Sequence, residues 1–301
     1  MKRKENLLIL RVAEGIGNQL FMYANAFSLS KKYNYKLLID NTSGYFKKKN
    51  QIRSYELNKF INNLNIASDK LKFDTYLKDL KRKFLKKIDP FFPRKNFYVE
   101  KKNYLKKTFF QEINLINYSN IIFLEGHFES EKYFKDYSED IKKFIKPDIN
   151  LLIKNNKYIN NLVSSNSVSI CIRQNRYSEG KFKDANKSSK FTKDTIDYIY
   201  RAVDFAKKKV SNPKFFIWSN DFKNLREYFN EDEYTFIENE ENKSINDFNL
   251  FNYSKHFIVG PTSFHWWGAW LNENPNKICI RPSNINPSKN ENLWPNEWIS
   301  I

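Results

Sequence analysis

The chain has few of the residues that build metal sites and disulfide frameworks. Only two cysteines and three histidines occur among its 301 residues, and no Cys/His pair has the spacing of metal ligands. Cys171 and Cys279 each stand in a short apolar run, which is typical of small buried side chains in a reducing compartment. We therefore expect neither a bound metal nor a disulfide.

Long apolar runs are missing as well. None approaches the roughly 20 residues of a membrane-spanning helix, and the basic N-terminus leads into an apolar stretch too short for a secretory signal. Mean hydropathy is −0.71, yet hydrophobic residues make up 41% of the chain and aromatic residues 17%. This is enough apolar material for a packed core, so the composition excludes general disorder and predicts a cytoplasmic globular protein.

Acidic residues are scarce in the first third of the chain. Residues 1–110 carry 26 Lys and Arg against 9 Asp and Glu, whereas residues 111–301 carry 26 against 25. Much of the excess is clustered, and the cluster at residues 81–87 also contains Phe84 and Leu85. One interpretation is an ordinary solvated surface. The other is attraction to a polyanion, because each Lys near an anionic membrane contributes about 1 kcal/mol of binding.

Of the two kinds of polyanion, the sequence favours anionic lipid over nucleic acid. It has no zinc finger, no helix-turn-helix spacing and no aromatic RNA-binding signature, so no nucleic-acid partner is expected. A basic cluster with interleaved apolar residues suits a lipid surface. We therefore expect peripheral attachment at the inner face of the cytoplasmic membrane as the alternative to a plain solvated surface.

Strand and helix patterns alternate along the chain in two blocks. The first block predicts strands at 7–12, 35–40 and 120–125, a helix at 18–33, and a further helix from about residue 131. The second block predicts strands at 167–173, 214–219, 234–237, 256–259 and 277–281, with helices between them. Such alternation is typical of α/β folds, and two blocks predict two Rossmann-like domains that face a cleft.

The domain boundary is predicted near a proline. Pro147 ends the last helical pattern of the first block and marks a linker at about 146–160. We therefore place an N-terminal domain at 1–155 and a C-terminal domain at 156–301. Residues 41–110 are highly charged and are expected to form a basic helical insertion in the first domain.

A strand, a two-glycine turn and a helix open the chain. Gly15 and Gly17 lack a Cβ, which lets backbone N–H groups at the start of the helix approach a phosphate or another anion. Asn18 and Gln19 follow directly, and helix capping does not account for these polar side chains. The pattern predicts a nucleotide-type anion site, although a strand–Gly-x-Gly–helix by itself is common.

The strand expected at 167–173 delivers arginines at its carboxyl end. In open α/β sheets this is the edge at which nucleotides bind. The planar guanidinium of Arg173 can bind two phosphate oxygens at once and keeps its proton at all relevant pH values. Solvated surface arginines are the alternative interpretation, and the sequence leaves it open.

Four segments carry patterns that occur together in one known family. Residues 15–19 read Gly-Ile-Gly-Asn-Gln, and residues 123–134 read Phe-Leu-Glu-Gly-His-Phe-Glu-Ser-Glu-Lys-Tyr-Phe. Residues 216–221 read Phe-Ile-Trp-Ser-Asn-Asp, and residues 262–271 read Thr-Ser-Phe-His-Trp-Trp-Gly-Ala-Trp-Leu, the most specific of the four. The series resembles the motifs of the family 11 glycosyltransferases, the inverting α-1,2-fucosyltransferases, and it covers nearly the whole chain.

The arginine motif of that family is altered in this chain. The family pattern His-x-Arg-Arg-x-Asp, usually followed by Tyr, stands here as Cys171-Ile-Arg173-Gln174-Asn-Arg176-Tyr177. Arg173 keeps the phosphate-binding position of the pattern. Because Arg176 reverses the charge of the family's Asp, the resemblance leaves open which sugar the donor carries.

The matched segments contain groups suited to a guanine nucleotide. Asp221 ends a strand, and its carboxylate can accept both the N1–H and the exocyclic NH₂ hydrogens of guanine. Thr262 and Ser263 open a helix and can bind phosphate, and Phe264 can stack on the base. For Thr262 a plain helix cap is the alternative, and the three tryptophans of the segment are expected in the core.

The resemblance implies a GT-B fold and an inverting, metal-independent enzyme without a cofactor. Its reaction would move fucose or a related sugar from a GDP-sugar to a hydroxyl of a bacterial surface glycan. The residues assigned to catalysis are Arg173 and Asn18, and those assigned to donor binding are Gly15, Gly17, Gln19, Cys171, Asp221, Thr262, Ser263 and Phe264. The general base is not identified, and Glu125, His127 and Glu129 are candidates. A non-catalytic homologue that binds GDP or sugar, and a polyanion-binding protein, stay open as alternatives.

Overall fold

The computed structural model describes residues 5–47, 53–102, 105, 107–145, 157–174, 176–177, 183–238 and 243–301. The chain forms two compact units, Met1–Ile145 with Lys289–Leu293 and Lys146–Ser288 with Trp294–Ile301. The first unit thus ends before the expected boundary at residue 155, and it takes in a segment from near the C-terminus. The linker expected at about 146–160 falls mostly outside the described residues.

Hydrogen bonds between loops bring residues 289–293 into the first unit. The buried amide of Asn290 donates through Nδ2 to the carbonyl of Glu129 (2.7 Å) and accepts from the backbone N–H of Phe109 (3.4 Å). The backbone N–H of Glu291 donates to the carbonyl of Lys107 (2.8 Å). Contacts of this kind leave no periodic pattern in a sequence, so the expected boundary did not include them.

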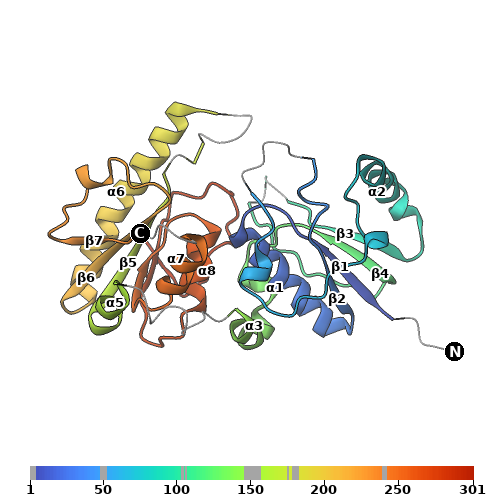
Figure 1. Ribbon diagram of the computed structural model, residues 1–301, viewed down its shortest axis with the longest axis horizontal. Coiled ribbons are helices and arrows are strands. Elements are labelled where there is room, and N and C mark those ends of the chain that lie inside the picture. Colours follow the sequence, from blue (N-terminus) through green and yellow to red (C-terminus); the bar gives the residue numbers. More distant parts are fainter. Residues whose placement is uncertain are drawn as a thin grey trace. The chain divides into compact units, whose positions relative to one another are not determined.

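The sheet of the first unit has four parallel strands in the order β2-β1-β4-β3. The elements of this unit are β1 Leu7–Arg11, α1 Ile16–Tyr33, β2 Lys36–Asp40, α2 Tyr76–Ile88, β3 Lys95–Val99, β4 Tyr118–Glu125 and α3 Ser138–Phe144. The central strands are buried through Leu8, Leu10, Ile122 and Leu124, as expected for a parallel sheet covered on both faces. Figure 1 shows α1 and α2 on opposite sides of this sheet.

Two expectations for the first unit are wrong. The segment at 41–110 is not simply a helical insertion, because it contributes β3 to the edge of the sheet as well as α2. The helix expected from about residue 131 is replaced by two 3₁₀ turns, Glu131–Tyr133 and Lys135–Tyr137, ahead of α3. In β3 the single buried side chain is Phe97, so this edge strand has too weak an apolar pattern to be predicted.

The sheet of the second unit has six parallel strands in the order β10-β9-β8-β5-β6-β7. This is the strand order of a dinucleotide-binding Rossmann fold. The elements of the unit are α5 Ile159–Ser164, β5 Asn166–Ile172, α6 Ala185–Lys209, β6 Pro213–Ser219, β7 Tyr234–Phe236, α7 Lys243–Phe251, β8 His256–Ile258, α8 Ser263–Leu271, β9 Cys279–Arg281 and β10 Ile299–Ser300. Between β6 and β7, where the sequence predicts a helix, the structure has a single 3₁₀ turn, Leu225–Glu227.

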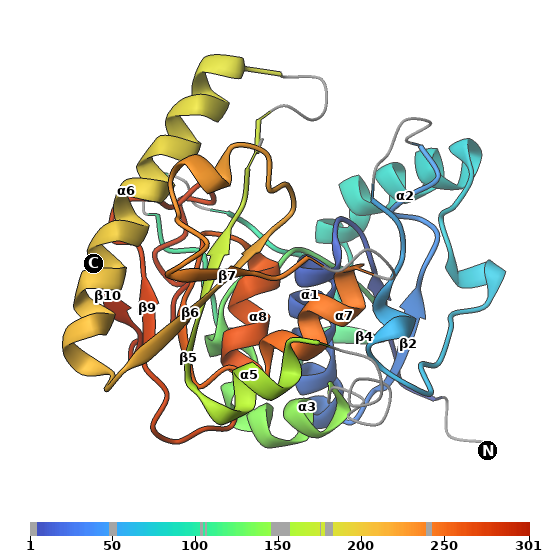
Figure 2. The same cartoon turned by 60° about the vertical axis from the view of Figure 1, so that its left-hand side comes forward.

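Helices cover both faces of the second sheet. Tyr198 and Ile199 of α6 pack with Val168 and Ile170 of β5 on one face, and α7 and α8 lie on the other (Figure 2). On that second face Trp266 and Trp267 of α8 are fully buried and Trp270 is nearly so. The expectation that these tryptophans are core residues is confirmed, and their packing fixes α8 against the sheet.

Strand order determines where each unit can bind a ligand. The order reverses between β5 and β8 in the second sheet and between β1 and β4 in the first. In the second sheet the connections after β5 and β8 leave toward opposite faces, so a crevice opens beyond the carboxyl ends of these strands. In the first sheet the segments after β1 and β4 pack against each other on one face, as the contact of Phe27 with Phe144 shows. The residues predicted to bind or catalyse follow those ends, and each unit is described separately below.

Candidate functional site

The second-unit site lies at the carboxyl ends of β5, β6 and β8. The loops after β5 and β8 approach each other closely, since a Cβ on Gly260 would stand 2.3 Å from the carbonyl oxygen of Cys171. No side chain fits in that space, so the glycine permits the start of α8 to lie against the end of β5. Arg173 and the segment Thr262–Phe264 are brought to one edge in this way.

Arg173 lies near His265 in the first turn of α8. Burial, together with the positive charge of Arg173, lowers the pKa of His265 to about 3. The Nδ1 atom of His265 is buried and has no hydrogen-bond partner among the residues that the structure describes. A neutral imidazole, a guanidinium and the N-terminus of a nine-residue helix therefore meet at this edge, which is an arrangement suited to an anion.

Thr262 caps α8, as the alternative interpretation of this residue predicts. Its Oγ1 accepts a hydrogen bond from the backbone N–H of His265 (3.3 Å), and the residue is 9% exposed. Phosphate binding by the turn at Ser263 stays a prediction. Phe264 is half-buried and contacts Phe248 edge-on, with 5.5 Å between ring centroids, and its stacking on a base also stays a prediction.

Gln174 joins the loop after β5 to the loop after β6. Its Nε2 donates to the carbonyls of Asp221 (2.8 Å) and Lys223 (2.9 Å), and its backbone N–H donates to Oδ1 of Asn220 (2.9 Å). Oδ1 of Asp221 accepts from the backbone N–H of Lys223 (2.9 Å), so the carboxylate is held in one orientation. Where the related family has an arginine, this chain has a side chain that positions Asp221. The pairing of Asp221 with guanine stays a prediction.

Arg176 contacts the same edge from the other side of the loop. Its Nη1 donates to the carbonyl of Pro261 (3.3 Å), and its guanidinium lies 5.6 Å from the ring centroid of Phe191 in α6. The charge reversal noted in the sequence therefore lies beside the loop that leads into α8. An aspartate here would place a negative charge at the same point.

The prediction that Cys171 binds the donor is wrong. Its side chain is fully buried within β5, and burial raises the pKa of its thiol well above the ordinary value. Such a thiol stays protonated and packs as a small apolar group. The prediction followed the position of Cys171 in the motif, whereas Cys171 lies inside β5 and only the residues after Ile172, Arg173 among them, extend beyond the end of the strand.

The first-unit site surrounds the N-terminus of α1, at the carboxyl end of β1. Gly15 precedes the helix in an extended conformation, no side chain in the described part of the chain caps the helix, and no acidic residue stands in its first turn. Gly17 is buried and Asn18 half-buried in that turn. The side chain of Arg53 lies over Gly15, 3.5 Å from where a Cβ would stand. A helix N-terminus and a guanidinium thus coincide here as well, and the catalytic role of Asn18 stays a prediction.

Glu14 adopts a backbone conformation that is unusual for its residue type. Its φ of 64° lies in the left-handed region, which non-glycine residues seldom occupy. Its carbonyl is fixed by two donors, Nε2 of Gln19 (2.9 Å) and the hydroxyl of Tyr45 (3.1 Å). The surrounding structure therefore holds Glu14 in place, as is common at functional sites.

The prediction that Gln19 binds the donor is wrong. The side chain is fully buried, and its Nε2 donates to the carbonyls of Glu14 (2.9 Å) and Ser54 (2.8 Å). Its Oε1 accepts from the backbone N–H groups of Glu56 (3.0 Å) and Leu57 (3.1 Å). Both donors and both acceptor positions of the amide are occupied, so Gln19 shapes the loop around the site and has no capacity left for a ligand.

Glu125 is a poor candidate for the general base. Burial alone would raise its pKa, but hydrogen bonds from Lys86 (2.7 Å) and Arg82 (2.6 Å) outweigh this effect and lower it. Glu125 is only 8% exposed, and its carboxylate pairs with two cations. A general base must be able to accept a proton from a substrate. Glu125 has instead a structural role, since it pairs with Arg82 and Lys86 at the end of β4.

His127 and Glu14 are better placed for proton transfer. The pKa of His127 is lowered to about 4, mainly by burial and also by the charge of Lys102, whose Nζ lies 3.0 Å from Nδ1. The carboxylate of Glu14 opposes this shift, so it lies near the imidazole. Glu129 is half-buried and its carbonyl is held by Asn290. None of these observations assigns the base, but they favour the Glu14–His127 pair over Glu125.

No group of three or more His, Cys, Asp or Glu side chains that could hold a metal ion occurs in the part of the chain that the structure describes. The positive groups at both edges are instead fixed side chains and helix ends. Their character suits a phosphorylated ligand.

Comparison with known proteins decides the family. The sequence profile described as glycosyl transferase family 11 matches residues 1–301. The chain belongs to family 11. An alpha-1,2-colitosyltransferase of Escherichia coli is 26% identical and aligns over 98% of this chain and 99% of its own. The O-antigen biosynthesis glycosyltransferase WbnK of Escherichia coli is 26% identical, over 95% of this chain and 98% of its own.

A solved structure supports the fold of this family 11 glycosyltransferase. A mutant of FUT1 from Arabidopsis thaliana, in complex with GDP, superposes with a TM-score of 0.53 at 12% identity, covering 97% of this chain and 75% of that one. The expected GT-B class, with two α/β units built on parallel sheets, is confirmed. That the two units face a cleft stays a prediction.

Three residues of this family 11 enzyme acquire a place in the site only through the structure. His265 lies within the tryptophan segment, where its neighbours indicate core packing. Gln174 stands where the family has arginine. The sequence shows only that the arginine is absent, and it does not show the loop contacts that Gln174 makes. Arg53 lies far from Gly15 in sequence, and no local signal connects the two.

Proposed function

We propose that this glycosyltransferase inverts configuration and moves a sugar from GDP to a hydroxyl of a bacterial surface glycan. The observation that supports a nucleotide donor best is the edge of the second sheet, where Arg173, His265 and the start of α8 meet beyond the switch point of a Rossmann strand order. The guanine base is supported by Asp221, which Gln174 and Lys223 hold in a fixed orientation.

In the proposed reaction an acceptor hydroxyl attacks the anomeric carbon while the bond to the β-phosphate breaks. The electron pair of that bond leaves with GDP, and the hydroxyl proton passes to a base. Arg173 and the N–H groups of the first turn of α8 would stabilise the charge that develops on the leaving phosphate, a role that needs no metal ion. On the acceptor side, the Glu14–His127 pair would receive the proton.

The donor sugar is proposed to be a deoxyhexose, with fucose or a related sugar as the main candidates. One relative of the chain is named for colitose and not for fucose, so members of this family differ in the sugar that they transfer. Arg176 differs from the family motif and donates to the carbonyl of Pro261, in the loop that leads into α8. An altered charge at this point is expected to act on turnover more than on GDP affinity.

The proposal is tested by thermal shift with GDP, UDP, ADP and CMP, followed by turnover with a panel of GDP-sugars. We expect GDP to stabilise the protein and UDP not to, because uracil offers Asp221 only one donor. Asp221→Ala should weaken GDP binding about tenfold or more. Asp232→Ala, a carboxylate of the same unit that contacts the Asn230 side chain, serves as the control and should bind GDP normally.

Two outcomes would overturn the assignment in different ways. Equal stabilisation by GDP and UDP would remove Asp221 as the base-reading residue. GDP binding without turnover of any GDP-sugar would instead favour the non-catalytic homologue that the altered arginine motif leaves open.

The reaction is proposed to take place at the inner face of the cytoplasmic membrane. No helix in the described part of the chain is long and apolar enough to cross a bilayer, so attachment would be peripheral. The excess of 26 Lys and Arg over 9 Asp and Glu in residues 1–110 supports attraction to an anionic lipid surface.

A further inference from the structure

Helix α2 presents its apolar side outward. In an ordinary surface helix the apolar stripe faces the core and the charged side faces water. In α2 the inward side carries Asp79, which is 2% exposed, and Arg82. The outward side carries Tyr76, Leu77, Leu80 and Phe84, which are between 60% and 80% exposed.

Ion pairs fix this unusual orientation. Arg82 donates to Oδ1 of Asp79 through Nε (3.1 Å) and Nη2 (2.8 Å), and to Glu125 through Nη1 (2.6 Å). Lys86 donates to the other oxygen of Glu125 (2.7 Å), and Lys47 pairs with Asp79. Because Glu125 ends β4, the network ties the polar side of α2 to the sheet and cannot be satisfied if the helix rotates.

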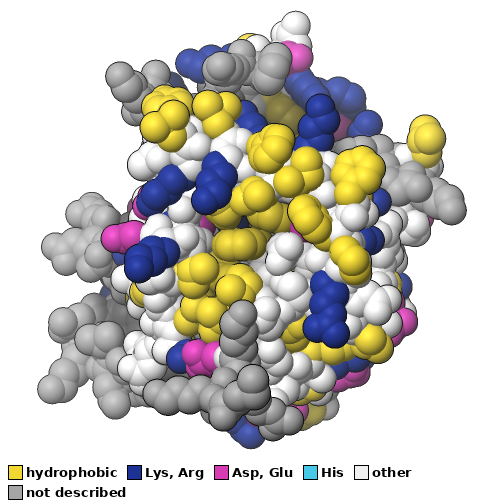
Figure 3. Space-filling view, turned by 90° about the vertical axis from the view of Figure 1, so that its right-hand side faces the viewer, with side chains coloured by type: hydrophobic (Ala, Val, Ile, Leu, Met, Phe, Trp, Pro, Cys, Tyr) yellow, Lys and Arg dark blue, Asp and Glu magenta, His cyan; other side chains and the backbone are white. Residues whose placement is uncertain are grey.

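The outward stripe continues beyond the end of α2. Leu77, Leu80 and Phe84 are spaced three and four residues apart and share one side of the helix, and Phe91 (85% exposed) and Phe92 follow in the next turn. Figure 3, which shows the side of the first unit where α2 lies, has hydrophobic side chains gathered on this face with Lys and Arg among them. Contiguous exposed apolar patches on soluble proteins usually mark an interaction site.

Basic side chains border the stripe. Lys81, Lys83 and Lys87 of α2 are exposed, as are Arg94 and Lys95 just beyond it. An apolar stripe flanked by lysines is typical of helices that lie in the plane of a membrane interface, with aromatic and leucine side chains among the lipids and lysines at the headgroups. A second copy of this chain would bring a similarly basic surface to the same place, so charge disfavours self-association through α2.

We propose that α2 and the turn at Phe91–Phe92 insert into the interface of an anionic membrane. This inference names the surface responsible for the membrane attachment proposed above, and it is independent of the identity of the donor. The buried ion-pair network acts as the support that keeps the apolar stripe turned toward the lipid.

Vesicle sedimentation tests the proposal with the full-length protein. Wild type should bind vesicles that contain about one quarter phosphatidylglycerol and bind pure phosphatidylcholine weakly, since both charge and apolar insertion contribute. The double variant Leu80→Gln/Phe84→Gln should bind about tenfold or more weakly. Val163→Gln, an exposed apolar residue of α5 in the second unit, is the matched control and should bind as wild type does.

Each result either supports or overturns the proposal. If wild type binds anionic vesicles but the α2 variant binds equally well, membrane attachment stands and α2 is not its surface. If wild type binds neither kind of vesicle, both statements fail. A dimer of wild type in solution that the α2 variant abolishes would show that a second copy, and not lipid, covers the stripe.

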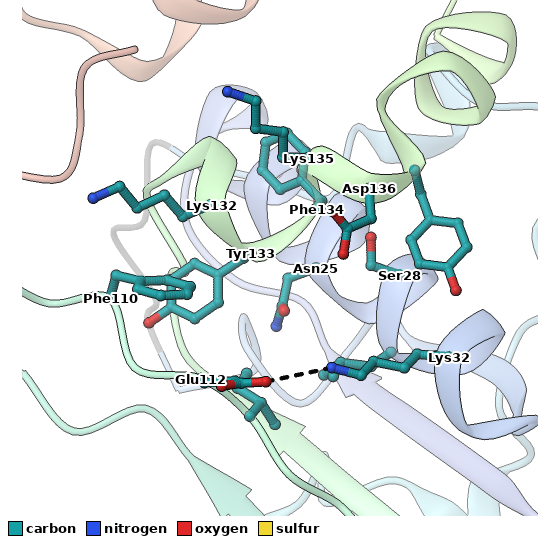
Figure 4. A pocket seen from close by; sticks show the side chains of 13 residues that line it. Asn25, Ser28, Lys32, Phe110, Glu112, Lys132, Tyr133, Phe134, Lys135 and Asp136 are labelled. Atoms are coloured by element: carbon teal, nitrogen blue, oxygen red, sulfur yellow. Dashed lines mark ion pairs between the residues drawn. The ribbon is translucent and has the colours of Figure 1, made fainter. Parts of the chain in front are cut away.

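A pocket on the first unit supports a second, independent inference. It has a volume of about 180 Å³ and lies between α1, the segment at residues 110–113 and the turns at 132–137. Figure 4 shows Asn25 and Ser28 of α1 on its floor, aromatic side chains including Phe110 and Tyr133 on its wall, and the Lys32–Glu112 ion pair at its rim. The volume is below the ~300–1,000 Å³ of a drug-sized site, so the pocket suits a single ring.

The floor of this pocket contains polar groups without partners. Asn25 is fully buried, and neither its Nδ2 nor its Oδ1 has a hydrogen-bond partner within the described ranges of the chain. The Oγ of Ser28, which is 5% exposed, is in the same situation there. Buried polar groups in folded proteins are nearly always paired, so each exception calls for a ligand or an ordered water.

The chemistry of the pocket suits a sugar. A sugar hydroxyl donates and accepts at once, which matches the Asn25 amide, and the C–H face of the ring can pack on aromatic side chains. Because Asn25 is fully buried, a ligand reaches its amide only when a side chain of the pocket wall moves aside. Phe110 and Tyr133 are held edge to face, 5.0 Å between centroids, by hydrogen bonds of the Tyr133 hydroxyl to the neighbouring backbone. We infer that this pocket binds one ring of the glycan acceptor, an inference that rests on the proposed acceptor class.

Thermal shift with free galactose, glucose and N-acetylglucosamine tests the pocket. At least one sugar should raise the Tm of wild type, and Asn25→Leu should abolish the shift while the shift with GDP remains. Asn160→Leu, an exposed residue of the second unit, is the control and should keep both shifts. If no sugar stabilises wild type, or if Asn25→Leu responds as wild type does, the pocket holds only water. The thermal shift with GDP tests the proposed donor separately from the pocket.

Discussion

Some residues of the two candidate sites use their side chains entirely within the fold, whereas others can reach a ligand. Gln19 and Cys171 match motif positions, yet one uses every hydrogen-bonding position of its amide internally and the other is sealed within β5. Arg173 and His265, by contrast, bring to one place a charge and a buried nitrogen that has no partner among the described residues. A motif therefore predicted the neighbourhood of the site, but burial decided which of its side chains reach a ligand.

Replacing Arg173 tests the anion site directly. Arg173→Ala should lower turnover about 10²- to 10³-fold with the fold intact, because the variant lacks the positive charge that stabilises the leaving phosphate. Arg173→Lys should restore little of it, since lysine lacks the planar fork. Steady-state rates together with circular dichroism would show this, and an alanine variant with most of its activity would transfer the role to Arg176.

Elements could be predicted where their apolar pattern was strong. Strands β1, β5 and β6 contain runs of buried residues, β4 buries three residues near its carboxyl end, and all four strands lie close to where the sequence places them. The edge strand β3 and the two-residue strand β10 were not predicted, because pairing with a neighbour forms them and their own residues carry little pattern. In α2 the apolar pattern was strong, but the apolar side of the helix faces outward. Only the ion pairs of Asp79 and Glu125 reveal which side faces inward.

Two glycines at the starts of helices should respond differently to a Cβ. Gly260→Ala would bring a methyl group to 2.3 Å from the carbonyl of Cys171, a backbone atom that cannot move aside, and should cost about 1–3 kcal/mol of unfolding free energy. Gly15 has an extended φ of −79°, and a Cβ there meets only the flexible side chain of Arg53.

Gly15→Ala should accordingly change the stability by less than about 0.5 kcal/mol. Urea titration of both variants measures the difference. Equal stabilities would show that the loop after β8 yields more easily than its contacts suggest.

The molecule as a whole should lose stability in mild acid because of its histidines. The pKa of His127 is lowered to about 4, that of His265 to about 3, and that of His256 also lies below its ordinary value, in each case mainly through burial. Below about pH 6.5 the unfolded chain binds protons that the folded chain does not, so the unfolding free energy falls as pH falls.

The loss should reach about 1.4 kcal/mol per pH unit for each fully shifted histidine, between about pH 6 and pH 4. Melting curves over this range would show it, and His127→Gln should flatten the slope. A Tm that stays constant down to pH 4.5 would mean that the imidazoles are more accessible to protons than their burial implies.

The segment at 289–293 has a consequence for how such enzymes can be recombined. Because Asn290 completes the first unit through Phe109 and Glu129, the two units are not two consecutive stretches of the chain. A chimera that exchanges everything after residue 145 would also replace a piece of the first unit and leave its loops facing foreign residues. Exchange of specificity between family members therefore requires three junctions: after residue 145 and on either side of the returning segment.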